Sequence, residues 1–122
     1  MNTQSIGNIR YFYKGVKIDD RTREYIEKRL ESLNKIADNI LQIEVEVDLD
    51  KKGKFRVEIM VKTPRNLFRS ENTTESIEGS TDMSIEELHI QIVGTKDKLR
   101  TLRDRGARSI KKKTVLDENS RF

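Results

Sequence analysis

The chain of 122 residues contains no cysteine, one proline and one histidine. Without cysteine there is neither a disulfide bond nor a thiolate metal ligand, which excludes disulfide scaffolds and cysteine-ligated zinc domains. A lone histidine, His89, cannot form a catalytic triad or a metal site without partners. No apolar run approaches the roughly 20 residues of a membrane span, and residues 1–8 lack the apolar core of a signal peptide. We therefore expect a cytoplasmic protein with no membrane association and no cofactor.

Apolar residues are scarce, at 34%, and charged residues abundant, at 38%. The apolar residues nevertheless follow regular patterns, which favours a small two-layer domain over a disordered chain. The length suits one domain, because two would each be too small for a stable core. We expect a flexible leader over residues 1–7, a folded domain over residues 8–113 and a flexible tail over residues 114–122.

Strict alternation is clearest in residues 41–50. Five apolar residues alternate there with polar ones: Leu41, Ile43, Val45, Val47 and Leu49. This period of two predicts a strand with one buried face. Residues 55–62 repeat the pattern after a Lys-rich turn, which predicts a hairpin whose acidic and basic outer rows pair across the ladder. Aromatic and β-branched residues predict a strand over 9–17, and Leu67–Thr74 is expected to form the fourth strand, after a turn at Pro64.

Two segments have helical periodicity. The first has Asp19 or Asp20 as N-cap, an apolar stripe and an end at Asn39; the stripe consists of Ile26, Leu30, Leu33 and Ala37. The second is expected to follow a mobile loop over Glu75–Asp82 and to begin at a capping box formed by Ser84 and Glu87. Its apolar stripe consists of Ile85, Leu88, Ile92, Leu99 and Leu102. The predicted fold is α+β, in the order β-α-β-β-β-α, with a four-stranded sheet and both helices packed on one face.

Positive charge is concentrated near the end of the second helix. Between Lys96 and Lys113 there are nine basic residues and only two acidic ones, Asp97 and Asp104. This window carries +7, whereas the whole chain carries +4 and the remainder therefore −3. Such self-repulsion costs folding free energy unless a polyanion neutralises it. The pattern is typical of a polyanion binder, and RNA is the leading candidate.

Other side chains are weaker candidates. Tyr11 and Tyr13 share one face of the first strand, with Phe12 opposite; they could stack on bases, although packing in the core explains them as well. The acidic row on the second strand consists of Glu44, Glu46, Asp48 and Asp50. These carboxylates lie about 7 Å apart on a wet face, since a strand rises about 3.3 Å per residue, with nothing to raise a pKa. We interpret them as a solvated face that would keep RNA on the helices. With no Gly-rich phosphate loop either, an enzyme is not expected.

Four sequence features together resemble a known family. They are the first helix with its segment Glu27–Lys35, the fourth strand with Phe68-Arg69-Ser70-Glu71, the segment Glu87-Leu88-His89 followed by Ile92, and Asp97-Lys98-Leu99 before the basic helix end. In this order, over residues 8–113, they resemble the ribosome hibernation promoting factor family, whose members have a fold similar to double-stranded RNA-binding domains.

The resemblance implies a function. Family members bind the small ribosomal subunit at the 16S rRNA of the decoding region, block the mRNA and tRNA sites, and preserve inactive ribosomes. This chain resembles the short type, which lacks a C-terminal dimerisation domain, and a monomer is expected off the ribosome. The implied rRNA contacts, together with the basic density of the second helix, are Lys28, Arg29, Lys35, Lys96, Lys98, Arg100, Arg103, Arg105, Arg108, Lys111 and Lys112.

Three departures from the family pattern stand out. The segment from Thr73 to Glu86 reads as a longer loop, His89 replaces a tyrosine, and Leu102 shifts the apolar register of the second helix. Two alternatives remain open from the residues themselves: a general double-stranded RNA-binding module, and an adaptor whose charged helix binds an acidic protein.

Overall fold

The computed structural model describes the backbone of residues 8–37 and 39–115, and side chains as far as Lys98. Six elements follow one another: β1 (Asn8–Lys14), α1 (Asp20–Asn34), β2 (Gln42–Leu49), β3 (Phe55–Lys62), β4 (Leu67–Thr74) and α2 (Ile77–Val115). The predicted order and the α+β class are confirmed. The chain divides into two compact units, residues 1–92 and 93–122. Of the predicted terminal segments, residues 1–7 and 116–122 lie outside the described residues, whereas Thr114 and Val115 still belong to α2.

The four strands form one sheet in the order β1-β2-β3-β4. β1 and β2 are parallel and the other two pairs are antiparallel. A parallel pair needs a crossover connection, and α1 supplies it. β1 ends at Lys14, three residues before the predicted end, because Gly15 turns the chain with a φ of 69°.

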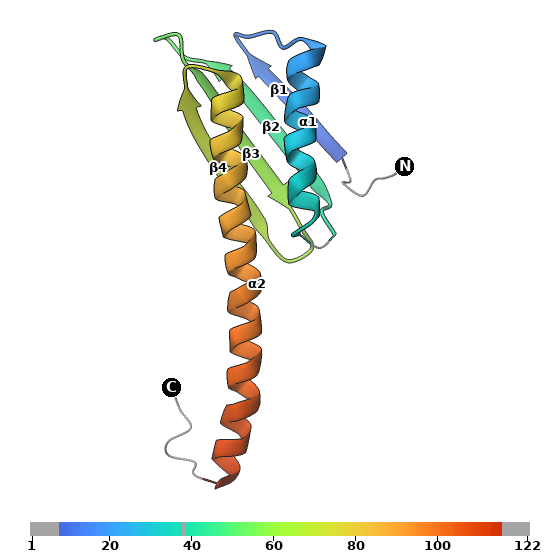
Figure 1. The fold of residues 1–122 in the computed structure, drawn as a ribbon, viewed down its shortest axis with the longest axis vertical. Helices are drawn as coiled ribbons and strands as arrows, with labels where there is room; N and C mark the ends of the chain where they lie inside the picture. The colour runs from blue at the N-terminus through green and yellow to red at the C-terminus, as the bar shows by residue number, and fades with distance from the viewer. Residues whose placement is uncertain (1–7, 38, 116–122) are drawn as a thin grey trace. The chain divides into compact units, whose positions relative to one another are not determined.

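The core lies between one face of the sheet and the two helices. Within residues 1–92, α1 and the beginning of α2 lie on the same face, as Figure 1 shows. The alternating residues Ile43, Val45 and Val47 are fully buried, as are Val57, Ile59 and Val61 on the neighbouring strand. The predicted helical stripes fill the other side with Ile26, Leu30, Leu33, Ala37, Ile85, Leu88 and Ile92. Leu41 and Leu49, at the ends of the predicted alternation, are exposed.

Helix α1 begins as predicted and ends earlier. Asp19 is its N-cap, and its carboxylate accepts a hydrogen bond of 2.9 Å from the backbone N–H of Thr22. The helix ends at Asn34, with Lys35 as C-cap, so the predicted end at Asn39 is wrong. Asn39 instead has a φ of 59°, a left-handed conformation that asparagine tolerates better than most residues.

The predicted start of α2 at Ser84 is also wrong, and so is the long loop before it. Only Glu75 and Ser76 separate β4 from α2. The hydroxyl of Ser76 accepts a hydrogen bond of 2.9 Å from the N–H of Gly79, so that Ser76 caps the helix. The longer loop that was inferred between Thr73 and Glu86 as a departure from the family pattern is therefore absent, because β4 and α2 occupy most of this segment.

The first turns of α2, which the sequence predicted to be a loop, carry a row of polar side chains that faces the end and edge of the sheet. The Ser80 hydroxyl donates a hydrogen bond of 2.6 Å to the carbonyl of Phe55, and the Ser84 hydroxyl one of 3.3 Å to that of Val57. One turn further on, Glu87 accepts hydrogen bonds from the side chains of Ser70 and Asn72. Glu87 therefore does not close a capping box, because its carboxylate binds β4 instead.

Gln91 continues this row along the edge strand. Its side-chain amide donates a hydrogen bond of 2.8 Å to the carbonyl of Arg69 and accepts one of 3.4 Å from the N–H of the same residue. The carboxamide therefore satisfies both backbone groups of Arg69, which covers part of an edge that would otherwise be open to another strand.

Substitution by alanine is expected to have opposite effects on stability at Gly79 and Gly94, the two glycines of α2 whose surroundings the structure describes. A Cβ on Gly79 would lie 2.9 Å from both Ser76 Oγ and Thr74 Oγ1 and would disturb the cap, whereas a Cβ on Gly94 would meet nothing within 4 Å. We expect Gly79→Ala to destabilise the fold by about 1–2 kcal/mol, and Gly94→Ala to stabilise α2 by about 0.5–1 kcal/mol. Thermal unfolding followed by circular dichroism measures both. Equal effects of the two substitutions would contradict the assignment of Ser76 as the cap.

Candidate nucleic-acid interface

The basic stretch from Lys96 to Lys113 lies entirely within α2, as the sequence predicts. Lys96 and Lys98 are exposed. The side chains of the other predicted contacts on this helix lie outside the described residues: Arg100, Arg103, Arg105, Arg108, Lys111 and Lys112. The part of the helix from Lys96 to Lys113 thus carries nine cationic residues and two acidic ones, whereas the part before it carries four acidic residues and no lysine or arginine. A helix of this charge attracts phosphate and loses that attraction as salt rises.

The three candidates on or beside α1 differ in their surroundings. Lys28 and Lys35 are exposed. Arg29 is held instead by the second helix, because its Nε lies 2.9 Å from Asp82 Oδ1. The hydroxyl of Tyr25 donates to the same carboxylate at 2.8 Å, and this hydrogen bond raises the pKa of Tyr25. Arg29 therefore joins α1 to the beginning of α2, whereas the two lysines are accessible to a ligand.

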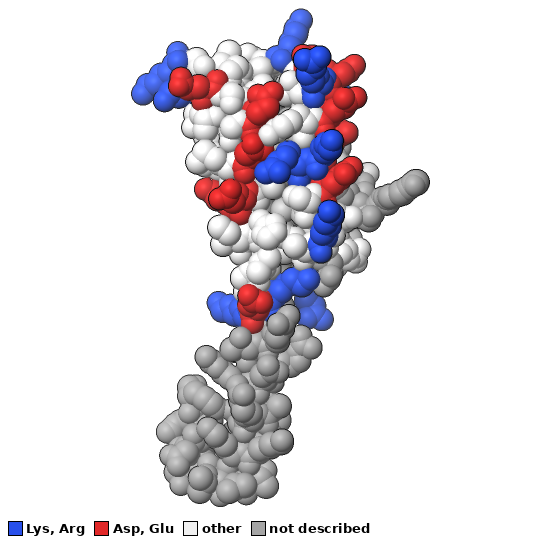
Figure 2. Space-filling view, viewed as in Figure 1, with Lys and Arg blue, Asp and Glu red and all other residues white. Residues whose placement is uncertain are grey.

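Charges of both signs are mixed on this side of residues 1–92. In Figure 2 acidic and basic side chains are mixed and form no continuous basic surface, and residues 77–92 of α2 contain four acidic residues and no lysine or arginine. The Arg29–Asp82 pair adds little stability, about 0–1 kcal/mol, because both side chains are roughly two-fifths exposed. Any strong attraction for a polyanion must therefore come from the basic helix together with the individual exposed lysines.

The aromatic residues of β1 divide between the two faces as predicted. The rings of Tyr11 and Tyr13 stack with centroids 6.1 Å apart and pack against the core. The Tyr11 hydroxyl donates a hydrogen bond of 3.1 Å to Glu27, and the Arg23 guanidinium lies 5.2 Å from the centre of its ring. Burial and the neighbouring Glu27 carboxylate raise the pKa of Tyr11. This environment favours packing over base stacking for the two tyrosines.

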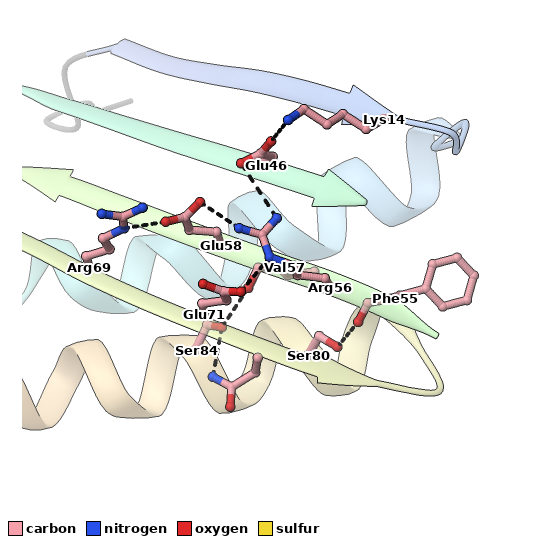
Figure 3. A network of polar contacts seen from close by, with 11 residues as sticks. Lys14, Glu46, Phe55, Arg56, Val57, Glu58, Arg69, Glu71, Ser80 and Ser84 are labelled. Atoms are coloured by element: carbon pink, nitrogen blue, oxygen red, sulfur yellow. Dashed lines mark hydrogen bonds and ion pairs between the residues drawn. The ribbon is translucent and has the colours of Figure 1, made fainter. Parts of the chain in front are cut away.

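The opposite face of the sheet carries a network of ion pairs (Figure 3). Three glutamates lie directly opposite one another on β2, β3 and β4: Glu46, Glu58 and Glu71. Like charges in such a row repel one another. The guanidinium of Arg56 offsets the repulsion by contacting all three carboxylates, and Arg69 pairs with Glu58.

The predicted pairing between acidic and basic rows is confirmed at Arg56, but the predicted wet acidic row is only partly correct. Glu46 is mostly covered, and its hydrogen bond of 2.8 Å from Lys14 lowers the pKa of its carboxyl. Asp50 leaves the row and accepts backbone N–H groups in the following turn. The alternation of residues along one strand could not predict that Arg69 and Glu71 join this network, because their ion pairs depend on the register between β3 and β4. The face is therefore balanced in charge instead of acidic.

Within the described residues, no group of three or more His, Cys, Asp or Glu side chains could hold a metal ion. His89 is exposed on α2. In the same part of the chain no helix is both long enough and apolar enough to cross a membrane.

Solved structures with the same fold exist. The N-terminal domain of Protein Y from Thermus thermophilus is 28% identical, with a TM-score of 0.65 over 75% of this chain and 99% of that one. A ribosomal subunit interface protein from Coxiella burnetii is 25% identical, with a TM-score of 0.65 over 74% of this chain and 98% of that one.

The family comparison covers most of the chain. Residues 9–100 match the model of the sigma 54 modulation protein / S30EA ribosomal protein family. The match includes Lys96, Lys98 and Arg100 and stops before Arg103, so the later basic residues are supported by charge alone. The resemblance to the hibernation promoting factor family is confirmed. The chain belongs to the sigma 54 modulation protein / S30EA ribosomal protein family.

Proposed function

We propose that this protein is a cytoplasmic ribosome hibernation factor. It binds the small ribosomal subunit near the decoding region, occupies the sites of mRNA and tRNA, and inhibits translation while the inactive ribosome is preserved. Family membership and the likeness to a ribosomal subunit interface protein support this proposal. The protein acts by occlusion and catalyses no reaction, and it is a monomer off the ribosome.

The observation that carries the proposal is the charge of α2. A window with a charge of +7 forms part of one helix in a chain with a total of only +4. Each lysine or arginine that neutralises a phosphate releases condensed counterions, which supplies affinity and makes it dependent on salt. Phosphate contacts position a protein without reading sequence. Selectivity for the small subunit therefore comes from the shape of its folded rRNA.

The proposed contacts are the exposed lysines Lys28 and Lys35 and the basic residues of α2. Arg29 is paired with Asp82 but remains partly exposed, so it is a weaker candidate for a phosphate contact than the two lysines. The charge-balanced sheet face offers little attraction to phosphate and faces away from the two helices. RNA is therefore expected at the exposed lysines Lys28 and Lys35 and on the basic helix.

Co-sedimentation with purified ribosomal subunits at increasing salt tests the proposal, with initiator tRNA as competitor. We expect binding to the small subunit that weakens steeply with salt and is displaced by tRNA. Similar affinity for any A-form duplex would instead indicate a general RNA-binding module. An absence of ribosome binding at low salt would leave the acidic-protein adaptor as the better explanation.

A further inference from the structure

The turn between β2 and β3 concentrates exposed cations outside the proposed interface. Within four consecutive positions it carries Lys51, Lys52 and Lys54 around Gly53. All three lysines are exposed, and none has an ion pair or a side-chain hydrogen bond among the described residues. On the adjacent open face of the sheet, by contrast, Lys14 and Arg56 are engaged by glutamates. The cations of the turn are therefore available to a ligand.

The backbone of this turn is held in one conformation. One carboxylate oxygen of Asp50 accepts hydrogen bonds from the N–H groups of Lys52, at 2.8 Å, and Lys54, at 2.9 Å. Two backbone bonds close the loop, from Asp50 N–H to the Lys54 carbonyl and from Gly53 N–H to the Asp50 carbonyl. Gly53 has a φ of 82°, which an L side chain rarely adopts. Asp50 therefore shapes the turn and forms no ion pair with the lysines.

The turn lies at the end of the sheet where β1 finishes and α1 begins, as Figure 1 shows. A Cβ on Gly15 would lie 4.0 Å from the carbonyl of Leu49, so the β1–α1 connection runs beside the end of β2. That connection contains Lys17, which is also exposed and has no ion pair among the described side chains. Figure 2 shows basic atoms gathered at the upper left, the corner where Figure 1 places the turn.

We infer that the β2–β3 turn is a further phosphate-binding contact, which binds the backbone of folded RNA. A lysine ammonium is a compact point charge with three donors, suited to phosphate without regard to base sequence. A preorganised backbone lowers the entropy cost of binding. The inference rests on the proposed function and extends it, because it adds to the basic helix a contact for folded RNA within residues 1–92.

The first test compares two double substitutions that remove the same charge. Lys51→Ala with Lys52→Ala removes two cations from the turn, and Lys62→Ala with Arg65→Ala removes two cations that are also exposed, near the other end of β3. We expect only the first variant to reduce the slope of log affinity against log salt for the small subunit, by about 1.5, since each phosphate contact contributes about 0.7–0.9. Circular dichroism confirms that both variants fold.

The outcomes separate this inference from the proposed function. Wild-type binding with equal slopes for the two variants overturns the further contact at the turn and leaves the proposed function intact. A wild-type protein that does not bind the small subunit overturns both.

A second test identifies the partner of the turn. Because the chain has no cysteine, Lys52→Cys creates one attachment point for a short photo-crosslinker, and Arg65→Cys provides the control. We expect crosslinks from position 52 to rRNA and few from position 65. Crosslinks from position 52 to ribosomal proteins alone, or equal rRNA crosslinking from both positions, would overturn the inference.

Discussion

Reversal of Lys98, Arg103 and Arg105 to glutamate is expected to abolish binding to the small subunit and to leave the fold unchanged. The three substitutions convert the charge of the Lys96–Lys113 window from +7 to +1. Three lost phosphate contacts, together with new repulsion, should weaken binding at low salt by at least about 100-fold. Co-sedimentation measures the loss, and far-ultraviolet circular dichroism measures the fold.

A matched control separates the basic helix from net charge. Reversal of Arg10, Lys62 and Arg65 to glutamate changes the net charge by the same amount at exposed positions away from the proposed contacts. We expect this variant to retain most of its binding. If both triple variants lose binding equally, affinity depends on overall charge, and the basic helix is not a specific contact. If the helix variant still binds, the assigned site is wrong.

The second large effect concerns the core. Leu30 lies in the middle of the α1 stripe with none of its surface exposed. Leu30→Ala removes buried methyl groups and leaves a cavity that the sheet beneath it cannot fill, so we expect a loss of about 2–5 kcal/mol in the free energy of unfolding. Urea denaturation followed by circular dichroism measures this difference.

The neighbouring Lys28 supplies the control for this prediction. Its side chain is exposed on the same helix, so Lys28→Ala should change the free energy of unfolding by less than about 0.5 kcal/mol. The same variant should weaken ribosome binding, because Lys28 is a proposed phosphate contact. Leu30→Ala would then mainly lower the free energy of unfolding, whereas Lys28→Ala would mainly weaken ribosome binding. A loss of less than about 1 kcal/mol for Leu30→Ala would contradict its place in the core.

Local periodicity was sufficient to predict most of the fold. The alternation from Ile43 to Val47 and the stripe of Ile26, Leu30 and Leu33 are properties of neighbouring residues, and the structure buries all of them. The start of α2 was mispredicted because Ser80 and Ser84 have a loop-like composition. In the folded protein their hydroxyls bind strand carbonyls 25 and 27 residues away in the chain, a role that composition does not reveal.

For the candidate site, too, some features could be predicted from the sequence and others could not. The basic density of α2 is a property of consecutive residues, and the sequence by itself determined both this density and the order of the elements. Only the tertiary structure decided which cations are engaged and which are exposed. Arg29 meets Asp82 across 53 residues of chain, and Arg56 meets Glu71 across 15, because helix packing and strand register bring them together. Among the described residues, Lys51, Lys52 and Lys54 have no ion-pair partner, because Asp50, the acidic residue next to them in sequence, binds the backbone of the turn instead.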